Sequence, residues 1–193
     1  MLATASAIKV AGGTPVPVDI GDDNLISVSA IEAAITSNTA GIMPTQLNGR
    51  ICDMKSILAL ADKHGLFLVE DAAQALGSRY KGQHAGTFGL ASDISFFPAK
   101  VLGCYGDGGA LFTNDEELNL KFRSIRNHGG IERGHHDLVG MNGRFDTIQA
   151  AVLLAKLPHF SRELEARSSI GERYSSLLKE VCVIPSISEG NTH

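Results

Sequence analysis

Two residues of opposite charge mark the stretch of this 193-residue chain where chemistry is most strongly indicated. Asp71 follows the short apolar run from Leu66 to Val69 after one intervening acid, Glu70. Lys100 follows a second apolar run, from Ile94 to Phe97. Open α/β sheets place their ligand crevice just beyond the carboxyl ends of buried parallel strands. These positions predict a shared site in which Lys100 carries a cofactor and Asp71 tunes it.

The chemistry open to Lys100 is that of an amine nucleophile. A lysine amine is useful when it is unprotonated or held as a Schiff base, and pyridoxal phosphate enzymes use the second form. That cofactor needs an anion beside its pyridinium nitrogen, and Asp71 is a suitable one. Its phosphate needs neutral donors and backbone amides, which Ser95 and the glycines around Lys100 can provide.

Taken singly, each of these residues has an ordinary structural explanation. An aspartate after a strand is most often a cap or turn residue, and a lone lysine is most often a solvated surface charge. A serine in a strand usually satisfies a local hydrogen bond. Gly106, Gly108 and Gly109 are compatible with a tight turn, and no helix-opening GxGxxG follows them. A Rossmann-type nucleotide binder is therefore a weaker alternative, because it lacks its glycine fingerprint.

Composition argues against several other classes of protein. A formal net charge of -4 and an isoelectric point near 5.9 give no reason to expect binding to nucleic acid or to a membrane. Cys52, Cys104 and Cys182 are widely spaced and contain no CxxC pair, which argues against a disulfide framework and a zinc site. The adjacent His135 and His136 do not suggest a metal site either. We expect a cytoplasmic protein, without a signal peptide or membrane span.

The elements that must position Asp71 and Lys100 alternate along the chain. We predict helices over Ala5 to Val10, Ser29 to Thr36, Asp53 to His64 and Thr113 to Asn127, and strands over Pro15 to Ile20, Ala40 to Met43, Leu66 to Val69, Ile94 to Phe97 and Ala110 to Phe112. This alternation predicts an α/β fold with a mostly parallel sheet flanked by helices.

Polar residues mark where these helices should begin. Ser29 with Glu32 and Thr113 with Glu116 have the spacing of a capping box. Asp53 can accept a hydrogen bond from the first free backbone amides of the third helix.

The character of the chain changes after residue 145. Asp146 to Leu157 is strongly apolar and helical, Pro158 bends or restarts the helix, and Ser161 to Glu180 continues it as an amphipathic helix. Val181 to Ile187 reads as a further strand, and we expect the polar ending SEGNTH to be frayed.

Residues 70–89, EDAAQALGSRYKGQHAGTFG, and 95–118, SFFPAKVLGCYGDGGALFTNDEEL, resemble the DegT/DnrJ/EryC1/StrS family of pyridoxal-phosphate-dependent sugar aminotransferases. Ala3 to Ile20 is similar to the family's ATASAI-like segment and its PVxVDI. Gln46 to Met54 is similar to an HxxGxxxDM-like loop, although many members have histidine where Gln46 stands. The family's GxNxRxxxxQAA segment is matched by Gly140, Asn142, Arg144, Gln149, Ala150 and Ala151. The resemblance extends over nearly the whole chain.

This resemblance implies the aspartate aminotransferase-like fold, the fold type I of PLP-dependent transferases, and a role for each matched residue. Lys100 would hold pyridoxal 5'-phosphate covalently and later move a proton between the substrate carbon and the cofactor. Asp71 would pair with the pyridine nitrogen, and Gln74 would lie against the ring or its phenolic oxygen. Ser95 would bind the phosphate. Asn142 would reach the phosphate of a neighbouring subunit, which implies a homodimer with a shared active site.

The resemblance also implies a reaction. Some members are dehydratases with histidine at the lysine position, so the lysine at position 100 favours transamination. An amino acid, commonly glutamate, would donate the amine, and a nucleotide-linked keto sugar would accept it. Tyr105, His128 and Arg144 are weaker candidates for the substrate side, and Arg144 is equally compatible with an ion pair at a helix start. The sugar, its nucleotide and the aminated carbon stay open.

The chain is about half as long as a typical member of the family that it resembles. We therefore expect residues 1–145 to form a partial PLP-binding core, 146–180 a long bent interdomain helix, and 181–193 the start of a truncated C-terminal domain. Apolar faces should be left uncovered. The alternative to an aminotransferase is a truncated, catalytically silent protein that keeps part of the cofactor-binding core or serves only as an assembly or regulatory piece. We expect the purified chain to bind the cofactor weakly at best.

Overall fold

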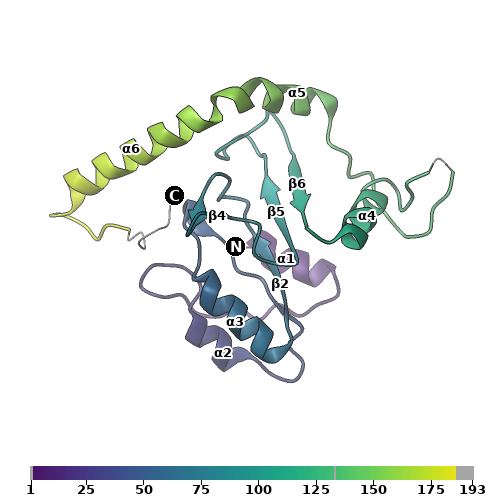
Figure 1. Cartoon of the computed structure of the whole chain (residues 1–193), viewed down its shortest axis with the longest axis horizontal. Coiled ribbons are helices and arrows are strands. Elements are labelled where there is room, and N and C mark those ends of the chain that lie inside the picture. Colours follow the sequence, from purple (N-terminus) through teal and green to yellow (C-terminus); the bar gives the residue numbers. More distant parts are fainter. Residues whose placement is uncertain (1, 133, 186–193) are drawn as a thin grey trace.

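The computed structural model describes residues 2–132 and 134–185 and has an α/β architecture (Figure 1). The strands are β1 (Gly41–Ile42), β2 (Phe67–Asp71), β3 (Arg79–Tyr80), β4 (Gln83–His84), β5 (Ala91–Ser95) and β6 (Gly109–Phe112). Four of them form a sheet in the order β1-β2-β5-β6, in which β1, β2 and β5 are parallel and β6 is antiparallel to β5. The prediction of an α/β fold with a mostly parallel sheet is confirmed.

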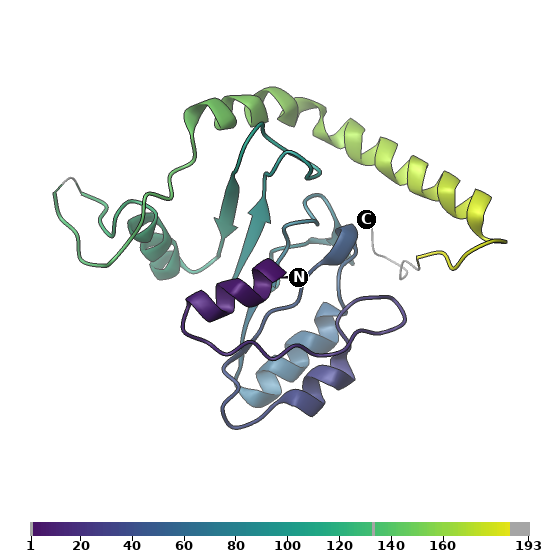
Figure 2. The same cartoon turned by 180° about the vertical axis from the view of Figure 1, so that it is seen from behind.

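The helices lie on two sides of this sheet. They are α1 (Leu2–Val10), α2 (Val28–Ala34), α3 (Met54–His64), α4 (Glu116–Ile125), α5 (Thr147–Lys156) and α6 (Phe160–Leu178), with short 3-10 turns at Leu47–Gly49 and Leu157–His159. Figures 1 and 2 show α2 and α3 side by side at one end of the molecule and the α5–α6 helix along the opposite side. Within residues 2–132 and 134–185, no helix combines the length and the apolar composition that crossing a bilayer requires.

The main hydrophobic core lies between β1, β2 and the pair α2 and α3. Ile31 of α2, Met54 and Ile57 of α3, Ile42 of β1 and Leu68 of β2 are all buried in it. Burial of a side chain of this size stabilises the fold by roughly 1.5–3 kcal/mol. This packing fixes β2, whose last residue carries the predicted acidic group of the site.

Glu70 is buried completely in the penultimate position of β2. Its carboxylate accepts hydrogen bonds from the backbone amides of Gly86, Phe88 and Gly89, at 2.9, 2.7 and 3.2 Å. It also accepts one from Nε2 of Gln46, at 2.9 Å. A buried carboxylate is tolerated only when its oxygens are paired in this way. The network therefore ties the loop before β5 to the end of β2.

The predicted strand from Pro15 to Ile20 is wrong. Only Ile20 pairs in this segment, in an isolated antiparallel bridge with Ile26. Pro15 and Pro17 have no N–H to donate to a neighbouring strand, so the alternating valines between them were not enough to build one.

The capping residue predicted for α2 is also wrong. Ser27 caps this helix, because its hydroxyl accepts a hydrogen bond from the amide of Ala30 at 3.3 Å. Ser29 lies inside the first turn, with its hydroxyl 2.9 Å from that of Ser27. Glu32 does not reach back to the helix start, since it pairs with Lys63 of α3 at 2.6 Å.

A similar correction applies to α4. Asp115 caps this helix and accepts a hydrogen bond from the amide of Leu118 at 2.9 Å. The hydroxyl of Thr113 instead donates to the carbonyl oxygen of Leu90, at 2.7 Å. The predicted capping box placed the start of α4 two residues too early. The hydroxyl of Thr113 is instead bonded to Leu90, which connects the end of β6 to the start of β5.

The predicted limits of α3 are confirmed. Asp53 accepts a hydrogen bond from the amide of Ser56 at 3.3 Å and begins the helix. Gly65 ends it in the left-handed conformation, with φ of 64°, which glycine adopts without strain.

The predicted long helix is present and bends where expected. A 3-10 turn that contains Pro158 separates α5 from α6. Neither helix has a buried residue, and together they extend beyond the sheet as an arm (Figures 1 and 2). The described part of the predicted strand from Val181 to Ile187, residues 181–185, contains no strand. Its last residues and the polar ending lie outside the described residues.

Candidate active site

The carboxylate of Asp71 lies at the carboxyl end of β2 and is 6% exposed. Its Oδ2 accepts a hydrogen bond from the hydroxyl of Thr4 at 2.5 Å and a longer one from Thr45 at 3.5 Å. Its Oδ1 accepts from the amide of Ala73 at 3.2 Å. A carboxylate has about four acceptor positions, so Asp71 keeps capacity for a further donor. This anion is held in one orientation by α1, by the segment after β1 and by its own loop.

Asp93 places a second carboxylate beside the first. Asp71 and Asp93 are partners in the parallel register of β2 and β5, so their side chains leave the sheet on the same face. Burial and the negative charge of Asp71 raise the pKa of Asp93 to about 6, while the charge of Lys100 opposes that rise. A shifted carboxyl group of this kind is typical of functional sites.

The loop that carries Lys100 is fixed at several points. The amide of Lys100 donates to the carbonyl oxygen of Phe97 at 2.8 Å, and the amide of Cys104 donates to that of Phe96 at 2.8 Å. Gly103 lies so close to the carbonyl oxygen of Pro98 that a Cβ at this position would be 2.5 Å from it. The loop therefore folds back tightly on the end of β5.

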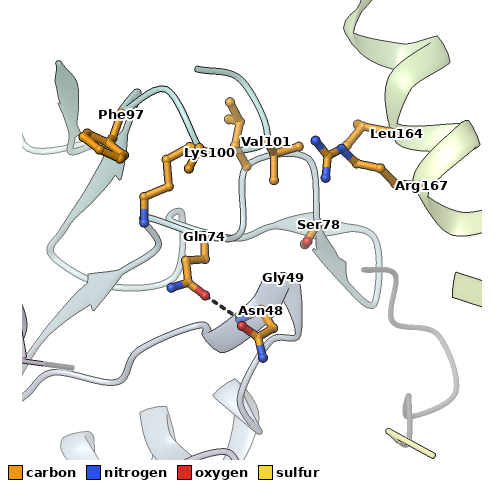
Figure 3. Close-up of a pocket in the computed structure, with 11 residues that line it drawn as sticks. Asn48, Gly49, Gln74, Ser78, Phe97, Lys100, Val101, Leu164 and Arg167 are labelled. Carbon is orange, nitrogen blue, oxygen red and sulfur yellow. Dashed lines mark hydrogen bonds between the residues drawn. The ribbon is translucent and has the colours of Figure 1, made fainter. Parts of the chain in front are cut away.

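Lys100 and Gln74 line one cavity, which we call the Lys100 cavity (Figure 3). Its volume is about 570 Å³, and its lining residues are Asn48, Gly49, Gln74, Leu76, Ser78, Phe97, Ala99, Lys100, Val101, Leu164 and Arg167. The side-chain oxygen of Gln74 accepts a hydrogen bond from the amide of Asn48 at 2.9 Å. A cavity of this size is within the range of small-molecule pockets.

The structure thus brings some of the predicted site residues together. Lys100 and Gln74 share the cavity. Asp71 does not line it, but Asp71 and Lys100 both influence the pKa of Asp93. Ser95 ends β5 at the same edge of the sheet, and its hydroxyl accepts a hydrogen bond from the amide of Phe97 at 3.3 Å. Ser95 does not line the Lys100 cavity.

Other candidates lie apart from the cavity. Asn142 forms an isolated antiparallel bridge with Asn127, beyond the end of α4. Arg144 donates from Nη1 to the side-chain oxygen of Asn127 at 3.0 Å, and no carboxylate in the described part of the chain pairs with it. Tyr105 is 81% exposed. His128 adopts a left-handed conformation, with φ of 62°, in the loop after α4.

Sequence reasoning missed three side chains of the site. Asp93 carries a sequence signal, since a charged residue alternates with the buried Ser92 and Ile94 inside an otherwise buried strand. Thr4 and Arg167 have no such signal in the sequence, because their place in the site depends on how distant segments pack. Neither their residue types nor their spacing indicates it.

The side chains that are present fit pyridoxal phosphate. A buried carboxylate with remaining acceptor capacity suits a pyridinium nitrogen, and an amine that faces a cavity suits covalent attachment. The hydroxyl of Ser95 accepts a hydrogen bond from Phe97 and can still donate its own proton, as a phosphate group needs.

Comparison with known proteins gives a consistent result. Residues 1–192 match the sequence profile of the DegT/DnrJ/EryC1/StrS aminotransferase family. The chain is 45% identical over 181 residues to the UDP-2-acetamido-2-deoxy-3-oxo-D-glucuronate aminotransferase of Pseudomonas aeruginosa, with 93% of this chain and 50% of that protein aligned. It is 44% identical over 196 residues to a pleiotropic regulatory protein of Geobacillus stearothermophilus, with 99% and 53% aligned.

Solved structures agree with these sequence matches. The crystal structure of a DegT DnrJ EryC1 StrS aminotransferase from Brucella abortus superposes with a TM-score of 0.95 and 42% sequence identity. The match covers 100% of this chain and 54% of that one. The chain therefore spans about half the length of these relatives, and its fold is that of part of their structure.

Proposed function

Because this chain belongs to the DegT/DnrJ/EryC1/StrS aminotransferase family, we propose that it provides the pyridoxal-phosphate-binding core of a sugar aminotransferase. The reaction would move an amino group from an amino acid, with glutamate as the expected donor, to a keto sugar linked to a nucleotide. The Pseudomonas relative is named for an oxo sugar acid linked to UDP, which supports an acceptor of this chemical class.

The single observation that supports this proposal is that Lys100 and Gln74 line one cavity. The oriented carboxylate of Asp71 lies outside that lining, but its charge and that of Lys100 both act on Asp93. The amine of Lys100 would attach to the cofactor and later, once released from it, would hold or release the proton that moves between the substrate carbon and the cofactor. When bound, pyridoxal phosphate would supply an electron sink for the bond-breaking at that carbon.

Asp71 would keep a positive charge on the pyridine nitrogen, which is what makes the ring effective in this role. Its hydrogen bonds from Thr4 and Ala73 hold the carboxylate in place without consuming all of its acceptor positions. Gln74 would orient the ring from the cavity side, and Ser95 would donate its hydroxyl to the phosphate.

Asn142 supports the proposal of a shared site. It lies outside the Lys100 cavity of its own chain, near Asn127. The resemblance to the family implies that Asn142 reaches the phosphate of a second copy of the chain, so we propose that the site is completed in a homodimer.

The proposal is tested by titrating the full 193-residue chain with pyridoxal phosphate and recording its visible absorption. We expect a new band that is lost in Lys100→Ala and kept in Lys81→Ala, whose ammonium lies over the ring of Tyr80 instead. A band that survives Lys100→Ala would contradict the assignment of the lysine, whereas no band in the wild-type chain would support the silent alternative.

The amine transfer is a separate measurement. The chain with pyridoxal phosphate, glutamate and a UDP-linked keto sugar should form 2-oxoglutarate. A visible band without 2-oxoglutarate would support the silent alternative, in which only part of the cofactor-binding core is retained.

A further inference from the structure

The Lys100 cavity contains a second cation, Arg167 of α6. Lys100 and Arg167 are the charged residues among those that line this cavity, and no carboxylate lines it. The chain as a whole has a formal net charge of -4, so this positive lining is a local feature. A cavity lined by one sign of charge raises the local concentration of ligands of the opposite sign.

Close packing fixes the part of α6 that carries Arg167. Gly77, which has φ of 95°, lies directly under Leu164, and a Cβ at Gly77 would be 2.6 Å from Cδ1 of Leu164. Residues three apart share one face of a helix, so Arg167 faces the same side as Leu164. Figure 3 shows the guanidinium extending from α6 toward the loops that carry Ser78 and Val101.

The guanidinium of Arg167 has no protein partner in residues 2–132 and 134–185. None of the ion pairs there includes it, and no hydrogen bond there uses its nitrogens. Arg50 and Arg144, by contrast, each donate to an oxygen of the chain. The five N–H donors of Arg167 are therefore available to a ligand.

We propose that Arg167 binds the diphosphate of a nucleoside diphosphate group in the Lys100 cavity, an inference that rests on the proposed sugar aminotransferase function. The planar guanidinium donates two parallel hydrogen bonds to a phosphate, which an ammonium group cannot do. Lys100 is assigned to the cofactor, so Arg167 is the cation that remains for the substrate.

Two other anions could use the same chemistry, the phosphate of the cofactor and a carboxylate of the amine donor. The cofactor phosphate is assigned to Ser95, which does not line the cavity. A single carboxylate carries less charge than a diphosphate and so gains less from the guanidinium. The diphosphate is therefore the favoured ligand.

The test uses the full chain without pyridoxal phosphate and measures the binding of UDP, dTDP and GDP by isothermal titration calorimetry. We expect at least one of them to bind, and Arg167→Gln to weaken its binding by about tenfold or more, the effect of losing a hydrogen-bonded charge. Arg167→Lys should recover part of the loss. Arg162→Gln removes an exposed arginine of α6 that does not line the cavity and should leave binding unchanged.

Further ligands separate the possible sources of the effect. Uridine lacks phosphate, and its binding should be the same in wild type and Arg167→Gln. The proposal is overturned if no nucleoside diphosphate binds, if Arg162→Gln weakens binding as much, or if uridine binding falls equally. It is also overturned if Arg167→Gln weakens only the binding of glutamate or pyridoxal phosphate. If the wild-type chain shows no visible band when it is titrated with pyridoxal phosphate, that result counts against the proposed function and not against this proposal.

Discussion

Asp71 and Asp93 place two carboxyl groups on one face of the sheet, and Lys100 lies near enough to Asp93 to act on its pKa. The negative charge of Asp71 disfavours the ionised form of Asp93. Lys100 opposes the effect, so the group is balanced between one cation and two anions. The state of Asp93 therefore depends on pH within a range that experiments reach.

We predict that Asp93→Asn stabilises the chain at pH 7 and that the gain disappears at low pH. The pKa of Asp93 is raised to about 6 from an ordinary value near 3.8. Its contribution to stability is therefore fully present below about pH 4 and is lost as the pH rises through 6. Asparagine removes the buried charge that causes this loss.

The measurement is urea unfolding at a series of pH values, followed by circular dichroism. The difference in unfolding free energy between Asp93→Asn and wild type should be positive at pH 7 and shrink toward pH 4. Asp62→Asn, on the exposed side of α3, is the control. A variant less stable than wild type at pH 7 would show that the carboxylate of Asp93 is stabilised by contacts beyond those described.

Glu70 is expected to be sensitive to loss of its charge. Glu70→Gln places an amide among three backbone N–H donors, and at least one of these donors loses its acceptor. We predict a loss of about 1–3 kcal/mol in the free energy of unfolding, measured by urea titration. Glu117→Gln changes an exposed partner of Lys121 and should shift stability by less than about 0.5 kcal/mol. Equal effects would mean that burial of Glu70 does not matter.

At the scale of elements, local sequence was informative where local contacts decide the outcome. The start of α3 at Asp53 and its end at Gly65 follow from residues within one turn of each boundary. The cap of α4 depended on whether Thr113 was already used by Leu90, a contact 23 residues away. Spacing alone could not distinguish these cases.

The contact between the loop after β2 and α6 leads to a prediction about the packing of these elements. Gly77→Ala should destabilise the chain for two reasons, the strain of a left-handed conformation and the collision with Leu164. Gly82→Ala should introduce only the backbone strain, because φ of Gly82 is 85° and nothing lies within 4 Å of the added Cβ.

Comparing the two variants isolates the role of α6. Gly77→Ala should lower the urea midpoint more than Gly82→Ala and should also weaken nucleoside diphosphate binding, because it moves Arg167. Gly82→Ala should leave that binding unchanged. Equal binding by both variants would mean that the position of α6 does not influence the cavity.

At the scale of the whole molecule, the sequence predicted the sheet but not how the site closes. The order of strands and helices reflects hydrophobic periodicity, which is visible in sequence. The approach of α1 to Asp71 through Thr4 and of α6 to Lys100 through Arg167 is set by packing between segments 67 or more residues apart. Such contacts between distant segments leave no pattern in the local sequence.

The sheet was expected to leave apolar faces and edges uncovered, and Phe67 of β2 and Leu111 and Phe112 of β6 are exposed. The long helices expose apolar side chains as well. Ile148 and Leu154 on α5 are 72% and 68% exposed, and Leu177 on α6 is 67% exposed. Exposed apolar residues gathered on one element are typical of interaction surfaces. Together with the place of Asn142, they support the proposed homodimer.

We predict that the purified chain sediments with the mass of a dimer in analytical ultracentrifugation. The double change Ile148→Glu with Leu154→Glu should shift it toward a monomer without loss of helical circular dichroism, because both side chains already face solvent in the single chain. Leu2→Glu, on the exposed side of α1, should leave the mass unchanged. A monomeric wild-type chain would contradict the proposed shared site.

The α6 part of the arm also has a mechanical consequence. The helix has 19 residues, so its far end lies about 27 Å from Phe160. Arg167 lies about 10 Å from Phe160 along the same axis. A tilt of about 10° at the Phe160 end would carry the far end through roughly 5 Å and Arg167 through roughly 2 Å. The arm is thus a lever with its short side at the cavity, and a push on its far end reaches the guanidinium with reduced travel and increased force.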